Sequence, residues 1–261
     1  PTAPSSTGRH ASPSAIGGSL HIIADAVGEA GLRACLCYEV SDRDGPERCE
    51  AGIVENARFI ERVRQQGGTQ LGALFGLHAA LTLSDETLDR CVAAAPQGAG
   101  FHIHAAEGPA DQELSLSRYD MRVIHRLNAR GILGPRTIVA HAIAIDPWEM
   151  ETLRDTETWV SHQPRSNMNN AVGVADVPAM LRAGMKVVLG NDGFSNDMFQ
   201  EMKFAYLLHK SHRGDPRVMG GYEVMTMALA NNARLAGSIF GAGRLGRLAS
   251  GALADIIVLD Y

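Results

Sequence analysis

Histidine and carboxylate side chains follow a series of short apolar runs, each close to the point where a run ends. Five successive runs end in this way, at His78, at His104 with Glu107, at His141, at His162 and at Asp192. Random placement would scatter such residues over helices as well, as it does for other histidines among the ten, such as His125 and His209. It would not place them at the ends of five runs in succession. One such residue is more often a hydrogen-bonding loop cap, but five in series predict a chemical site.

These residue types predict a metal-assisted hydrolysis. Imidazole nitrogens with carboxylate oxygens, without thiolates, suit a catalytic Zn²⁺ or Fe²⁺ with one position open for water. Such an ion lowers the pKa of its water from about 15.7 to about 7. Glu107 is close enough to His104 to exchange a proton with that water. Asp192 can bind the ion and accept a proton, and His141 can orient the nucleophile. The implied reaction is hydrolytic displacement at an sp² carbon, as at C–NH₂, an amide or a C–halide bond.

For three residues the sequence alone leaves a second interpretation open. Asp192 with Gly193 is also typical of a hairpin turn, although the residues that follow lead into a helix. His102 and His104 share one strand face, so His102 is either a further ligand or a packing residue below the site. His10 lies in a Ser/Pro-rich coil, which is more typical of an exposed residue than of a ligand.

The elements that must position these residues alternate along the chain. Strand-like runs are predicted at residues 33–40, 69–75, 100–105, 137–140, 158–161 and 186–189. Helices are predicted after Ser84, after Asp146, and over about 197–210 and 222–239, with Gly184 as a C-cap and a last strand at 255–259. Repeated alternation predicts parallel strands with right-handed crossovers, in a barrel or a doubly wound sheet. No Gly-x-Gly-x-x-Gly lies between a strand and a helix, which disfavours dinucleotide binding.

Composition excludes several classes of protein. The 261 residues carry a formal net charge of −5, which offers no basic stripe for nucleic acid and no polybasic membrane anchor. The apolar runs are too short for a membrane span, and no signal peptide is evident. The four cysteines form no Cys-x-x-Cys pair, so we expect reduced core cysteines and a cytoplasmic protein.

At the strand ends the sequence resembles the amidohydrolase superfamily, in its cytosine-deaminase-like and chlorohydrolase branch. The matching motifs follow the family's order at residues 76–78, 104–107, 140–141, 160–167 and 189–193. Residues 251–259 resemble the family's return strand into a small β-sandwich. Residues 10–14 and 37–45 are most similar to the aminohydrolases associated with selenium metabolism.

The resemblance implies a TIM-barrel-type metal-dependent hydrolase, an aminohydrolase or a chlorohydrolase, that acts on a small molecule with one divalent metal, Zn or Fe. It makes His104 and Asp192 metal ligands and Glu107 the proton shuttle, with His141 beside the activated water. It places His78, His162 and Asn167 on the substrate side, the last two through the architecture of their loop. We also expect a homo-oligomer, with no nucleic-acid or membrane partner.

One departure from the family pattern shapes the expected organisation. The family carries a His-x-His ligand pair at the end of the first barrel strand, and nothing before His10 resembles it. We therefore expect strands three to eight of a (β/α)₈ barrel over residues 10–240. A foreign coil at 1–9 would precede them, and a return toward the sandwich at 241–261 would follow. His10 and His102 are candidate substitute ligands.

The sequence leaves two other functions open for comparison. The main alternative is a non-catalytic fragment of the same family that folds through dimerisation. A metal-independent barrel enzyme such as an aldolase needs a Schiff-base lysine or a phosphate loop. The lysines disfavour this hypothesis, because Lys186 begins a strand and the other two, Lys203 and Lys210, fall in a helical pattern.

Overall fold

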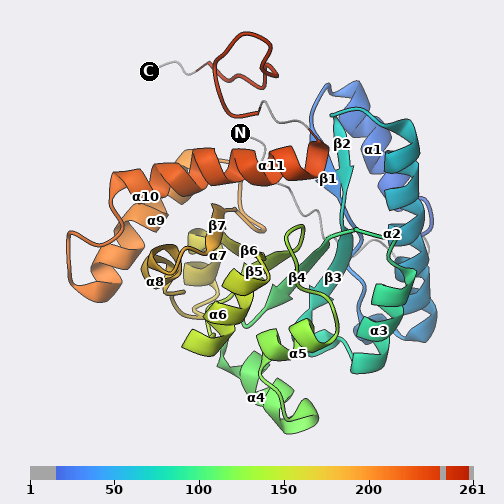
Figure 1. Ribbon diagram of the computed structural model, residues 1–261, viewed down its shortest axis with the longest axis horizontal. Coiled ribbons are helices and arrows are strands. Elements are labelled where there is room, and N and C mark those ends of the chain that lie inside the picture. The colour runs from blue at the N-terminus through green and yellow to red at the C-terminus, as the bar shows by residue number, and fades with distance from the viewer. Residues whose placement is uncertain (1–15, 242–244, 259–261) are drawn as a thin grey trace.

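The apolar runs form parallel strands in a computed structural model that describes residues 16–241 and 245–258. The strands are β1 (Ala34–Leu36), β2 (Leu71–Ala73), β3 (Phe75–Ala79), β4 (Phe101–Ala105), β5 (Ile138–His141), β6 (Trp159–His162) and β7 (Lys186–Leu189). β1 pairs with β2, and β3 to β7 pair in numerical order (Figure 1). A bridge between Val40 and Leu77 joins the two parts. The predicted α/β fold with a parallel sheet is confirmed.

The predicted run at 69–75 is divided between β2 and β3, and a buried asparagine accounts for the division. Asn56 inserts its amide between the two backbones: its Oδ1 accepts from the N–H groups of Tyr38 and Gly76, and its Nδ2 donates to both carbonyls. A Cβ at Gly76 would lie 2.3 Å from the Tyr38 oxygen, so only glycine fits here. The side chain thus replaces strand pairing at this point.

Helices separate the strands except at the β2–β3 division, and the start signals predicted at Ser84 and Asp146 are observed. The helices are α1 (Ser19–Glu29), α2 (Pro46–Gln66), α3 (Asp85–Ala94), α4 (Pro109–Tyr119), α5 (Val123–Ala129), α6 (Pro147–Asp155), α7 (Pro164–Asn169), α8 (Val177–Arg182), α9 (Met198–Arg213), α10 (Gly221–Met225) and α11 (Asn232–Phe240). Ser84 Oγ accepts from the Thr87 amide at the start of α3. Asp146 and Glu149 form a reciprocal capping box at the start of α6. A π-helical turn, Thr226–Asn231, joins α10 to α11.

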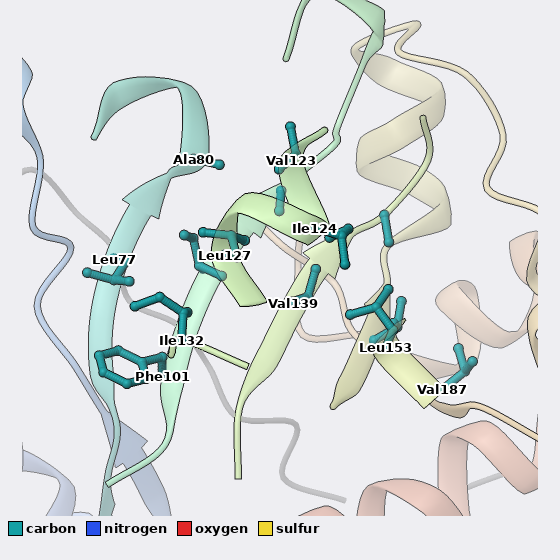
Figure 2. Packing of buried hydrophobic residues seen from close by; sticks show 14 of the residues in the cluster. Leu77, Ala80, Phe101, Val123, Ile124, Leu127, Ile132, Val139, Leu153 and Val187 are labelled. Atoms are coloured by element: carbon teal, nitrogen blue, oxygen red, sulfur yellow. The ribbon is translucent and has the colours of Figure 1, made fainter. Parts of the chain in front are cut away.

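Alternate residues of the strands point to opposite faces of the sheet, as the two-residue period requires. The outer face packs against helices: Leu77, Val139 and Val187 meet Ile124, Leu127 and Leu153 there (Figure 2). The inner face carries Ile138, Trp159 and Val188, which pack against Leu235, Ala236 and Phe240 of α11. Figure 1 shows α11 running across the molecule from the β7 side to the β1–β2 side. The inner face is therefore covered by a helix where the strands begin.

The predicted last strand is wrong for the residues that the structure describes. Residues 255–258 have no strand structure, and Ile256, Ile257 and Val258 are exposed. No described strand lies beside them, and an unpaired strand leaves its backbone N–H and C=O groups without partners. Residue 259 and the predicted coil at 1–9 lie outside the described residues.

Two further observations bear on the sequence predictions. All four cysteines are buried and free, which confirms them as core residues. In the part of the chain that the structure describes, no helix has both the length and the apolar character needed to cross a bilayer.

Candidate functional site

Four of the predicted residues meet at the carboxyl ends of the strands. His104 is the last residue but one of β4 and His141 ends β5, and their rings stack with centroids 5.5 Å apart. His141 Nε2 lies 3.8 Å from Glu107 Oε2 and 4.0 Å from Asp192 Oδ2. His102, His104, His141 and Asp192 line a small hollow on the inner face of the sheet. Residues at the ends of successive strands, although distant in sequence, therefore lie close together in the fold.

Both histidines hold one ring nitrogen in a hydrogen bond and direct the other away from it. His104 Nδ1 donates to the His78 carbonyl oxygen at 2.6 Å. His141 Nδ1 donates to Asn167 Oδ1 at 2.9 Å. Each Nε2 is consequently the nitrogen that can bind a metal or accept a proton. Burial is the largest cause that lowers the pKa of His141, which favours its neutral form.

Strained backbone marks the same strand ends. Ala106, His141 and Asp192 have positive φ values of 51°, 73° and 51°. Non-glycine residues in this region cost of order 1–3 kcal/mol each and cluster at functional sites. Asp120, Glu157, Ala171 and Met219, away from this edge, also have positive φ values, so the assignment of the site rests on its side-chain geometry.

Two acidic residues that the sequence reasoning missed also belong here. Glu39 Oε1 lies 3.8 Å from His104 Nε2, and the same strand-end criterion applied to the run 33–40 would have found it. Asp111, in the first turn of α4, accepts from the Ala106 amide at 2.5 Å. Burial raises the pKa of Asp111 to about 6. Asp111 thus holds the short segment that carries Glu107.

The residues expected on the substrate side lie in different places. His78 adjoins the hollow: its ring centroid is 6.1 Å from that of His104, and its Nδ1 lies 3.3 Å from Thr82 Oγ1. Asn167 is buried and reaches the site only through His141. His162 is not brought into the hollow. The β6 alternation points Ser161 into it and His162 to the opposite face, where its Nε2 lies 3.2 Å from His209 Nε2.

The fit of this donor set to a divalent metal is partial. The nitrogens and carboxylate oxygens have the right chemistry, and the hydrogen bonds at both Nδ1 atoms leave Nε2 bare. Within residues 16–241 and 245–258, however, no three His, Cys, Asp or Glu side chains converge well enough to hold an ion. His102 lines the hollow, its ring 5.9 Å from that of His104, and burial lowers its pKa to about 3. His10 lies outside the described residues.

Comparisons with known proteins match nearly the whole chain. The model of the amidohydrolase family matches residues 6–261. A 5'-deoxyadenosine deaminase from Methanothermobacter thermautotrophicus is 35% identical over 243 residues, 91% of this chain and 56% of that protein. A 5-methylthioadenosine/S-adenosylhomocysteine deaminase from Syntrophobacter fumaroxidans is 36% identical over 249 residues, 92% of this chain and 56% of that protein. The chain thus spans about half the length of these curated relatives.

Solved structures show the same fold. An adenosine deaminase from Xanthomonas campestris with bound zinc has a TM-score of 0.82 at 24% identity, over 91% of this chain and 54% of the other. An atrazine chlorohydrolase from Arthrobacter aurescens, complexed with zinc, has a TM-score of 0.71 at 20% identity, over 91% of this chain and 55% of the other. At these identities the likeness concerns the fold alone.

Proposed function

The chain belongs to the amidohydrolase family, and from this premise we propose that it is part of a metal-dependent hydrolase that deaminates an adenosine-type nucleoside. The names of two relatives, deaminases of 5'-deoxyadenosine and of 5-methylthioadenosine and S-adenosylhomocysteine, support this substrate class. The observation that carries the proposal is that His104, His141 and Asp192 line one hollow, with Glu107 Oε2 3.8 Å from His141 Nε2. The similarity to aminohydrolases of selenium metabolism stays a prediction.

The proposed chemistry is attack of water on the carbon that bears the amino group, with loss of ammonia. His104 Nε2 and the Asp192 carboxylate would hold the divalent cation, Zn²⁺ or Fe²⁺, which activates water near neutral pH when bound. Glu107 is one-third exposed and lies beside His141, so it can take a proton from the attacking water and deliver it to the leaving nitrogen. His141 Nε2, bare of a proton, accepts a hydrogen bond from the attacking hydroxyl. His78 contacts the substrate beside His104.

We further propose that the strands are strands three to eight of a (β/α)₈ barrel. In this assignment β1 is the third strand, β2 and β3 together are the fourth, and β4 to β7 are the fifth to the eighth. The parallel order from β1 to β7 and the share of each relative that the chain covers support this assignment. Active sites of such barrels lie at the carboxyl ends of the strands, as the four residues do here. The cytoplasmic location and the homo-oligomer remain predictions from the sequence, and sedimentation equilibrium would test the latter.

One observation favours the alternative, a non-catalytic fragment that folds through dimerisation. The described residues bring no three metal ligands to one point. A catalytic zinc site in proteins normally has three protein ligands. A chain that binds neither Zn²⁺ nor Fe²⁺ and sediments as a dimer would support the alternative.

Ammonia release from 5'-deoxyadenosine, by the purified chain supplied with Zn²⁺ or Fe²⁺, tests the proposed function. Glu107→Gln removes the proton carrier and is expected to lower the rate about 10²- to 10⁴-fold. Glu113→Gln changes an exposed glutamate of α4 and serves as the matched control. Equal rates for the two variants would contradict the role of Glu107. No release of ammonia by the wild-type chain would contradict the function.

A further inference from the structure

The first turn of α7 contacts the site through consecutive residues, although none of its side chains lines the hollow. Arg165, Ser166 and Asn167 each bind a different part of the molecule. Ser166 and Asn167 are almost fully buried, at 3% and 1% exposure. The hydrogen bonds that these side chains make to neighbouring elements hold the short helix in one position.

Asn167 determines which nitrogen of His141 carries the proton. Its Oδ1 lies 2.9 Å from His141 Nδ1, and a carbonyl oxygen can only accept, so Nδ1 must donate. The proton is then absent from Nε2, the nitrogen that faces Glu107 and Asp192. The reversed amide would place an N–H group against Nδ1 and would move the ring proton to Nε2.

The two neighbouring residues fix the carboxylate and the turn itself. Ser166 Oγ donates to Asp192 Oδ2 at 2.6 Å, which restricts the rotation of that carboxylate. Arg165 Nε donates to Glu201 Oε1 at 2.5 Å, and its Nη2 donates to the Ser195 carbonyl oxygen at 2.7 Å. Glu201 is fully buried on α9, so Arg165 attaches the turn to a fixed part of the fold.

We propose that the first turn of α7 is a positioning device, in which Asn167 holds His141 in the tautomer with a bare Nε2 while Ser166 orients Asp192. Its effect on the reaction rests on the proposed function. The tautomer itself does not, because it is a property of the chain without substrate. None of the three side chains lines the hollow: Asn167 acts through His141, Ser166 acts through Asp192, and Arg165 anchors the turn.

The ring ¹⁵N shifts of His141 test the proposal directly in the ¹⁵N-histidine-labelled chain. At pH 8 an ordinary imidazole is neutral, so the spectrum reports the tautomer. We expect Nδ1 protonated and Nε2 bare in the wild type, and a loss of this preference in Asn167→Ala. A protonated Nε2 in the wild type, or an unchanged tautomer in Asn167→Ala, would overturn the proposal. His141→Asn identifies the resonance.

Asn167→Asp keeps the proposal falsifiable even where Asn167→Ala fails to fold. A carboxylate accepts but cannot donate, so this variant must keep the wild-type tautomer if the amide oxygen faces His141. A switch of tautomer in Asn167→Asp would show that the amide nitrogen faces the ring instead, and would refute the assignment.

Kinetics supply the second readout in a chain that is active. Losing an outer partner of a site histidine typically costs 10- to 100-fold. We expect about this loss in kcat for Asn167→Ala, with little change in KM and partial rescue by Asn167→Asp. Asn170→Ala, an exposed residue just beyond α7, is the control. A chain without activity would contradict the proposed function but would leave the tautomer measurement intact.

Discussion

In both His104 and His141, a hydrogen bond at Nδ1 leaves Nε2 as the ring nitrogen without a proton. A backbone carbonyl holds Nδ1 of His104, and the Asn167 amide oxygen holds Nδ1 of His141. The carbonyl belongs to His78, so β3 and β4 define one tautomer together. The amide belongs to α7, so a helix between β6 and β7 defines the other. The tautomers of the two rings therefore depend on a backbone carbonyl and a buried amide, neither of which lines the hollow.

A second histidine pair, on the outer face of the sheet, predicts acid sensitivity. Burial lowers the pKa of His162 to about 3 and that of His209 to about 4, from 6.5. The native state then favours the neutral rings. Their contribution to stability is complete above pH 6.5 and is lost as the pH falls through the two folded values. We therefore expect the Tm of the His209→Gln variant to fall less between pH 7 and pH 5 than the Tm of the wild type.

His212→Gln is the matched control for that variant, because His212 lies on the same helix and is exposed. For a domain of this size about 1 kcal/mol shifts Tm by roughly 2–4 °C, so a difference between the two variants is measurable by thermal unfolding. Identical pH dependence of Tm in both variants and in the wild type would contradict the assignment of the pair as an acid-sensitive element.

For single residues, the sequence predicts well which polar side chains lie at strand ends. It predicts less well to which face of the sheet each of them points. The strand-end pattern identified His104, Glu107, His141 and Asp192, which the fold brings together. His162 satisfies the same pattern, but the alternation of side chains along β6 turns it away from the hollow. Asp111 is not recoverable from the pattern, because its role depends on the path of the β4–α4 connection.

At the scale of elements, the free edge of β7 is covered by two asparagines. Asn231 Nδ2 donates to the Val187 carbonyl oxygen, and Asn232 both donates to the Leu189 oxygen and accepts from its N–H group. These are hydrogen bonds that a further strand would otherwise make. The π-helical turn ends at Asn231, next to Asn232 at the start of α11. An exposed strand edge promotes aggregation, so this cover stabilises the sheet and protects it.

Asn232→Ala is expected to destabilise the fold by about 1–3 kcal/mol, because it leaves the buried backbone groups of Leu189 without partners. Urea unfolding measures the change, and Asn128→Ala, an exposed asparagine of α5, serves as the control. Equal stability of the two variants would show that the asparagine does not support the β7 edge.

Element types were more predictable than their boundaries and interruptions. Helix starts at Ser84 and Asp146 follow from local capping chemistry and are observed. The division of β2 from β3 depends on Asn56, which is distant in sequence and reaches the strands only in the folded chain. The strand predicted at 255–259 has suitable residues but lacks a described neighbour, and pairing is a property of the sheet.

At the scale of the whole molecule, a parallel sheet places the site at one end of the strands and a helix at the other. The hollow opens where the strands end, and α11 packs on the inner face where they begin. The chain spans about half the length of its curated relatives, and its described residues bring no three metal ligands together. Whether this half can hold a metal decides between the proposed hydrolase and the non-catalytic alternative.

Anomalous diffraction from crystals of the zinc-loaded chain tests this question most directly. Data collected on both sides of the zinc absorption edge locate the ion independently of the protein atoms. The proposed site predicts one peak within about 2.0–2.2 Å of both His104 Nε2 and an Asp192 carboxylate oxygen. A peak elsewhere, for instance beside His162 and His209, or no peak at the hollow, would contradict it.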